Sequence, residues 1–215
     1  MTDLSYPGPA VLRQGRGTLV ALALFGLWFA VAVWLGANGA FAAGDGELSP
    51  VLPIAVLLPG AAFLAAYATV PAVRNWALAL DPAVVVGMQS WRAAGILFVF
   101  LWLMGLLPPV FAVPAGFGDF AVGILAMFAA VAVARASVTG LPLALLVLAA
   151  GLLDFALAVG TGVLSNPGLM LAPATGPTSQ PMSLLPLSLV PTALVPWFLV
   201  LHLISWMQIR AGRIG

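Results

Sequence analysis

Five polar residues lie in stretches of this chain that are otherwise apolar, and their side chains could carry chemistry. They are Gln89, Arg92, Asp119, Asp154 and His202, in a sequence of which only 6% of residues are charged. A charge near the centre of a bilayer costs at least about 2.5 kcal/mol, so such residues normally face a bundle interior or a wet cavity. Carboxylate and imidazole groups form proton relays in membrane transporters. We therefore interpret the five residues as a substrate site or a proton relay.

The elements that position these residues must be membrane helices. Hydrophobic residues make up 63% of the 215 positions, and the mean hydropathy is +1.18. Soluble domains are only about 45–50% apolar. The long apolar runs lack the alternation that a membrane β-barrel requires. We predict an all-α, polytopic transmembrane bundle, with residues 1–215 forming a single integral membrane domain.

Six spans account for the apolar runs, since about 20 residues are needed to cross the hydrocarbon core. The predicted spans are 18–40, 51–72, 83–107, 117–136, 142–163 and 187–209. We expect the first span to be retained, because its apolar run is longer than the 7–15 residues of a typical signal peptide.

The arginines predict the orientation of the bundle, because short loops rich in positive charge stay cytoplasmic. Six arginines fall at alternate ends of the predicted spans and therefore on one side: Arg13, Arg16, Arg74, Arg135, Arg210 and Arg213. The opposite connections carry only Asp45 and Glu47. We predict that both termini are cytoplasmic.

Spacing along the predicted helices indicates which faces the polar residues share. Each of three spans has a stripe of polar and small residues, which favours close helix packing rather than contact with lipid. The stripes are Gln89, Arg92 and Gly95; Gly116, Asp119, Gly123, Ala126 and Ala130; and Gly151, Asp154, Ala158 and Gly162. Arg92, Asp154 and His202 are expected within side-chain reach of one another. Asp119, the third residue of its predicted span, is expected apart from them near the outer surface.

Each of these residues also has a purely structural interpretation. Arg92 and Asp154 could form an ion pair that only fixes packing. Asp119 could cap the fourth span, where the helix dipole favours a carboxylate. His202 could donate one ring proton to a carbonyl group in a helix interface. The segments around Asp119 and Asp154 both read A-G-x-x-D-F-A, which indicates either an inverted repeat or chance in a chain rich in these residues.

Prolines interrupt the pattern in two places. Pro108, Pro109 and Pro114 fall within 107–118, which is either a segment that dips into the membrane or a tight turn with Pro at the start of the fourth span. The second cluster is Pro181, Pro186, Pro191 and Pro196. It predicts that the sixth span starts near Pro191 or is kinked at Pro196.

Several functions are disfavoured by residues that the sequence lacks. Without cysteine the chain has no disulfide, iron–sulfur cluster or thiolate zinc site, and we predict no metal site. All seven basic residues are arginine, so no lysine is available for a Schiff base or a nucleotide-binding Walker loop. A net charge of +1 without a basic cluster gives no footprint for nucleic acid. The different expected depths of Asp119 and Asp154 do not favour a shared catalytic centre, so an enzyme is not the expected class.

Four motifs of the chain resemble those of a family of small, uncharacterised bacterial inner-membrane proteins. They are R-x-x-G-x-x-F from Arg92, L-P-P-x-F-A-x-P-A-G-x-G-D from Leu107, G-L-L-D from Gly151, and L-P-x-S-L-x-P-x-x-x-V-P-x-x-x-x-L-H from Leu185. The resemblance covers about 90–210 and does not extend to the first two spans. It implies a bacterial plasma-membrane protein with Arg92, Asp119, Asp154 and His202 at motif positions, and it implies no activity.

Three functions remain open from the sequence. The first is a small transporter or proton-conducting module with a buried relay of Arg92, Asp154 and His202, and with Asp119 at its outer entry. The second is a non-catalytic subunit or assembly partner of a larger membrane complex, and a homodimer is possible in either case. The third is a haem or pigment binder with His202 as axial ligand, completed by Met104, Met182 or a second subunit.

Overall fold

The computed structural model is all-helical over the residues that it describes. It describes the backbone of residues 9–44 and 46–214, and side chains from residue 15 onward; Arg13 and Asp45 therefore lie outside the described side chains. No strand occurs within this part of the chain, and six of its helical segments are long and apolar enough to cross a membrane. The predicted fold class and the number of spans are thereby confirmed.

The spans are built from helices of different lengths. Four are single or nearly single helices: α1 (Pro9–Ala37), α2 (Val51–Thr69), α6 (Pro109–Ala134) and α7 (Gly140–Leu164). The third span joins α4 (Pro82–Gly87), the 3-10 helix η1 (Met88–Ile96) and α5 (Leu97–Leu103), and the sixth joins the π-helix η3 (Val190–Leu194) to α8 (Val195–Arg210). Two short helices lie in connections: α3 (Pro71–Ala79) and the 3-10 turn η2 (Gln180–Ser183).

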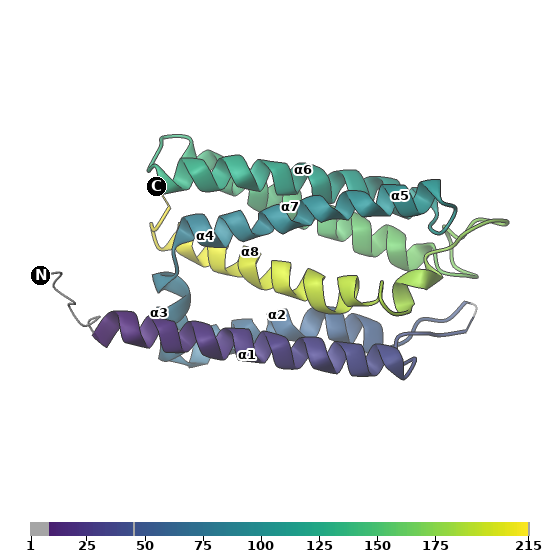
Figure 1. The fold of residues 1–215 in the computed structure, drawn as a ribbon, viewed down its shortest axis with the longest axis horizontal. Helices are drawn as coiled ribbons and strands as arrows, with labels where there is room; N and C mark the ends of the chain where they lie inside the picture. The colour runs from purple at the N-terminus through teal and green to yellow at the C-terminus, as the bar shows by residue number, and fades with distance from the viewer. Residues whose placement is uncertain (1–8, 45, 215) are drawn as a thin grey trace, which may run out of the picture.

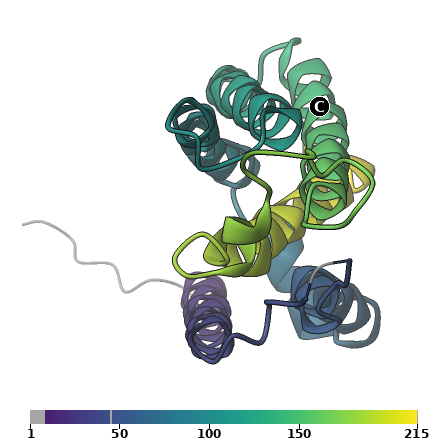
Figure 2. The same cartoon turned by 90° about the vertical axis from the view of Figure 1, so that its right-hand side faces the viewer.

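The helices form two groups with α8 between them. Figure 1 shows the spans running roughly side by side, and the end-on view of Figure 2 places α1 and α2 on one side of α8 and the other spans on the other side. Helix α6 packs against α7, η1, α4 and α5, and α8 packs against α2, α4 and α7. The polar residues fall on the elements in the second group and on α8.

Proline shapes the start of the sixth span, as the sequence predicted. Pro196 has no N–H to donate to the carbonyl group of Thr192, and the N–H of Val195 instead reaches back five residues to Val190. The indole Nε1 of Trp28, on α1, donates to the Thr192 oxygen at 2.8 Å. Phe25 of α1 also packs on Trp197, with ring centroids 4.4 Å apart. These contacts fix α1, a helix that otherwise has little buried surface.

The segment 107–118 does not dip into the membrane, and the predicted alternative of a tight turn with proline at the start of the fourth span is confirmed. The chain turns at 104–108, and α6 begins at Pro109, whose missing N–H is harmless in a first helical turn. Pro114 lies inside the helix. The fourth span therefore begins eight residues before the predicted 117, which changes the expected place of Asp119.

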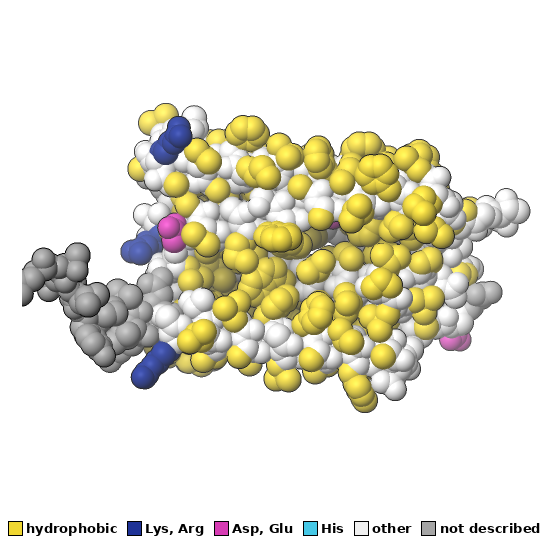
Figure 3. All heavy atoms as spheres, viewed as in Figure 1, with side chains coloured by type: hydrophobic (Ala, Val, Ile, Leu, Met, Phe, Trp, Pro, Cys, Tyr) yellow, Lys and Arg dark blue, Asp and Glu magenta, His cyan; other side chains and the backbone are white. Residues whose placement is uncertain are grey.

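Charged side chains gather at the ends of the bundle. Figure 3 shows basic side chains at the end of the bundle where α1 begins and α8 ends, acidic side chains at both ends, and a largely hydrophobic surface between. The described arginines other than Arg92 lie near the start of α1, in α3, directly after α6, and at and beyond the end of α8: Arg16, Arg74, Arg135, Arg210 and Arg213. This surface is the kind that a bilayer covers.

Candidate functional site

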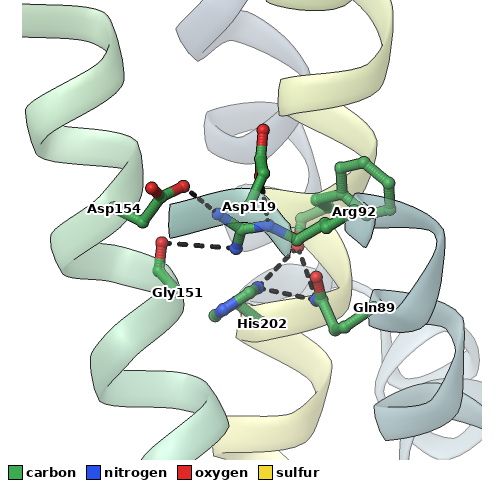
Figure 4. A network of polar contacts seen from close by, with 7 residues as sticks. Gln89, Arg92, Asp119, Gly151, Asp154 and His202 are labelled. Atoms are coloured by element: carbon green, nitrogen blue, oxygen red, sulfur yellow. Dashed lines mark hydrogen bonds and ion pairs between the residues drawn. The ribbon is translucent and has the colours of Figure 1, made fainter. Parts of the chain in front are cut away.

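The centre of the site is the guanidinium group of Arg92, which binds two other helices. Its Nε donates to Asp119 Oδ1 on α6 at 2.7 Å, and its Nη2 donates to Asp154 Oδ2 on α7. Its Nη1 donates to the carbonyl oxygen of Gly151 at 3.3 Å (Figure 4). The Arg92 side chain has no exposed surface, whereas those of Asp119 and Asp154 are 17% and 7% exposed. One arginine thus joins the third, fourth and fifth spans.

An aromatic ring covers the same guanidinium group. The Cζ atom of Arg92 lies 4.0 Å from the centroid of the Phe155 ring, a cation–π contact. The His202 ring lies 5.5 Å from the same Phe155 ring at an interplanar angle of 56°. Phe155, the residue after Asp154, therefore touches both the ion-pair centre and the histidine.

Gln89 and His202 form a second polar cluster with the carbonyl group of Phe198. Gln89 Nε2 lies 3.1 Å from the Phe198 oxygen and 2.7 Å from His202 Nδ1, which itself lies 2.9 Å from that oxygen. The Gln89 amide donates to the Phe198 oxygen, and His202 Nδ1 either donates to that oxygen or accepts from the Gln89 amide, according to the tautomer of the ring. Gln89 Oε1 and His202 Nε2 are buried without hydrogen-bond partners. The contact of His202 with a carbonyl group, expected from the sequence, is therefore present within its own helix, and Gln89 shares the same oxygen.

The 3-10 conformation of η1 explains why one segment serves both clusters. A 3-10 helix has three residues per turn, so side chains three apart are eclipsed. Gln89, Arg92 and Gly95 therefore share one face, as the stripe in the sequence predicted. In an α-helix, successive members of this set would instead be offset by about 60°.

Glycines provide the space for each charged side chain. A Cβ atom at Gly95 would overlap the Asp119 side chain, and one at Gly118 would overlap Asp154 Oδ1. A Cβ atom at Gly151 would overlap the His202 ring and lie 2.7 Å from Arg92 Nη1. The imidazole and the guanidinium thus meet at Gly151.

Asp119 does not lie apart from the other polar residues, contrary to the expectation from the sequence. Because α6 starts at Pro109, Asp119 lies ten residues into the helix, roughly 15 Å from its start. It is not the helix cap, and it shares Arg92 with Asp154. The sequence indicated that Asp119 and Asp154 lie at different depths and therefore do not share a centre, and this prediction is wrong. The Arg92–Asp154 pair predicted from the sequence is present.

Some participants were not predicted from the sequence. Phe155 and the Phe198 carbonyl group carry no polar signal, and Gly118 was not assigned to a stripe. Gly118 stands immediately before Asp119 in the sequence G-x-G-D. This pair of glycines could have indicated that another helix approaches closely there.

The charges of the centre do not balance if both carboxyl groups are ionised. The carboxyl groups of Asp119 and Asp154 both bind the one guanidinium group of Arg92, so the three groups occupy a single cluster. The formal charge is then one negative unit in an environment that penalises charge. Carboxyl groups so placed can hold a shared proton, which neutralises the cluster.

The described residues hold no group of three His, Cys, Asp or Glu side chains arranged for a metal ion. The two methionines considered as partners of His202 lie elsewhere: Met104 is 71% exposed after α5, and Met182 packs against the cluster around Phe98 and Phe111. The haem or pigment role of His202 stays a prediction.

The fold and the site together define an all-helical protein with six helices long and apolar enough to cross a membrane and with a buried Asp–Arg–Asp centre. The chain belongs to the family described as "Domain of unknown function (DUF8737)", which matches residues 49–210. Comparisons with curated proteins and with solved structures gave no match. The matched region includes α2 and all five predicted site residues, whereas α1 precedes it. The resemblance to bacterial inner-membrane proteins stays a prediction.

Proposed function

We propose that this protein is a small transporter or proton-conducting module whose working site is the Arg92 centre. The observation that carries the proposal is the pairing of one buried guanidinium with two carboxyl groups. Charge balance would need only one carboxylate per arginine. The second carboxylate gives the cluster a place for one proton.

The Gln89–His202 cluster supplies a second proton-exchanging group next to the first. His202 Nε2 and Arg92 Nη1 both lie against Gly151. The Phe155 ring contacts both the His202 ring and the guanidinium group of Arg92. Asp119 is the most exposed member of the network and serves as its contact with the outside. In this proposal a proton moves between Asp119, Asp154 and His202, and Arg92 holds the carboxyl groups in place.

The proposed setting is the plasma membrane of a bacterium, with both termini in the cytoplasm. The support is the collection of arginines at the end of the bundle that carries the termini, since positive loops stay inside. The lipid bilayer is the main partner, and a homodimer is compatible with the proposal. The proposal requires no nucleotide, nucleic acid, metal or other cofactor.

Proton flux into liposomes that contain the purified protein, measured under an imposed potential, tests the proposal. We expect flux with the native chain and its loss with Asp154→Asn, because the amide cannot take up the proton. His202→Ala should also abolish flux. Asp81→Asn is the matched control: Asp81 caps α4 through the N–H of Ala83, outside the centre, and asparagine caps equally well.

Native flux that Asp154→Asn leaves unchanged would contradict the proposal, provided the variant elutes as a folded protein. Absence of flux from the native chain would favour the second candidate, a non-catalytic subunit of a larger membrane complex. One observation supports that candidate: small residues bring helices into close contact, as where Gly123 of α6 lies against the backbone of Ala93 of η1. Co-purification with another membrane protein would identify it. A coloured preparation would instead support a haem or pigment bound to His202.

A further inference from the structure

The third span contains an unusual stretch of backbone at its middle. Helix η1 continues the 3-10 conformation over nine residues, whereas such runs rarely exceed three or four. It lies between two α-helical pieces, α4 and α5, in one continuous span. A mid-helix 3-10 stretch often marks a hinge or a sequence under strain.

The contacts of η1 show what maintains this conformation. Arg92 is fixed by Asp119 and Asp154 on one side, and Gln89 is fixed by Phe198 and His202 on the other. Gln89 and Arg92 are eclipsed in the 3-10 form, and both sets of bonds are made in that arrangement. An α-helical η1 would rotate one of the two side chains by about 60° relative to the other and so away from its present partners.

Close backbone packing supports the same conformation. A Cβ atom at Gly123 would overlap the backbone of Ala93, and one at Gly116 would lie 3.2 Å from the Gly95 carbonyl oxygen. Helix α6 thus presents glycines to the η1 backbone where it lies closest. The side-chain bonds and this packing oppose the preference of the backbone for the α-helix.

We propose that η1 is a two-state element whose conformation follows the protonation of the Arg92 centre. With both carboxylates ionised, two ion pairs hold Arg92 and the 3-10 form. When one carboxylate takes up a proton, one ion pair is lost and η1 relaxes towards the α-helix. The ionisable groups that face Arg92 are Asp119 from α6, Asp154 from α7 and His202 from α8.

This inference rests on the proposed function, because it makes the transported proton the trigger. Its geometric consequence is large enough to measure. A 3-10 helix rises about 2.0 Å per residue and an α-helix about 1.5 Å, so nine residues shorten by roughly 4.5 Å on conversion. The distance between α4 and α5 must shorten with them.

The test is a distance measured by pulsed electron paramagnetic resonance between nitroxide labels at Val84→Cys and Leu103→Cys. The chain has no cysteine of its own, and both positions are exposed, at 58% and 65%. We expect the distance in nanodiscs to shorten by roughly 4.5 Å when Asp154→Asn is introduced. The chain without Asp154→Asn should show the same shortening on passing from mildly alkaline to mildly acidic buffer. A label pair on α6, at Phe117→Cys and Val131→Cys, is the control and should not change.

Distances that stay the same in both comparisons would overturn the inference. The acid titration of the chain with Asp154 intact keeps the test decisive if Asp154→Asn does not fold. The two proposals fail separately. Proton flux without a change in the label distance would contradict the two-state element, whereas a change in the label distance without proton flux would contradict proton conduction.

Discussion

At the scale of the residue, the site depends on side chains that the surrounding glycines allow to approach. Arg92 places three nitrogens on three acceptors, and each acceptor lies where a neighbouring helix comes close. Breaking a buried pair is strongly destabilising, by about 3–5 kcal/mol, because a charge remains without its partner. Small changes in helix separation should therefore affect the whole centre.

Gly118→Ala tests this dependence. The added methyl group would overlap Asp154 Oδ1, so we expect the α6–α7 separation to increase, the midpoint of thermal unfolding in detergent to fall, and proton flux to be lost. Gly160→Ala is the matched control, because a Cβ atom there meets nothing within 4 Å and alanine favours the helix. Equal unfolding midpoints for the two variants would show that the approach at Gly118 is not needed.

At the scale of the element, two spans leave the regular α-helix, each for a different reason. The third span becomes a 3-10 helix where its side chains bind on both sides. The sixth becomes a π-helix where Pro191 and Pro196 remove backbone donors. The Thr192 carbonyl group, which receives no bond from Pro196, accepts from Trp28, and this bond attaches α1 to a domain whose family match begins at residue 49.

A double-mutant cycle with Trp28→Phe and Pro196→Ala tests this attachment. Trp28→Phe alone should destabilise the protein by about 0.5–1.5 kcal/mol, because it removes one hydrogen bond to the Thr192 carbonyl group, to which Pro196 has no N–H to donate. Pro196→Ala restores an N–H at this position of α8. In that background, Trp28→Phe should lower the free energy of unfolding by less than it does in the native chain. Unfolding in a denaturing detergent series provides the measurement. Additive effects would indicate that Trp28 acts only through packing.

At the scale of the whole molecule, an apolar surface surrounds a small polar centre, and arginines mark one end. The alternation of six spans places both termini at that end. The arrangement predicts the orientation in the membrane from charge alone.

Reporter fusions to each end of the chain test this orientation. A reporter that is active only in the cytoplasm should be active at both termini, and a reporter that is active only outside should be silent at both. Fusion within the connection around Glu47 should give the opposite pattern. Activity of the outside reporter at either terminus would contradict the predicted orientation.

The sequence by itself determined the fold class, the six spans and the faces on which the polar residues lie, because membrane helices are set by local apolar runs and by helical spacing. It also indicated the Arg92–Asp154 pair and the stripe that contains Gln89. Local patterns depend on neighbours along the chain, and these are visible in the sequence.

Only the tertiary structure decided that Asp119 joins the same arginine, that Gln89 binds His202, and that the third span is a 3-10 helix. Each outcome depends on contacts between residues far apart in the chain: 27 positions separate Arg92 from Asp119, and 113 separate Gln89 from His202. The start of α6 at Pro109 shifted Asp119 into the bundle, and the packing of glycines against neighbouring helices fixed the distances. Tertiary contacts therefore determined the chemistry of the site, whereas local sequence determined the helices that carry it.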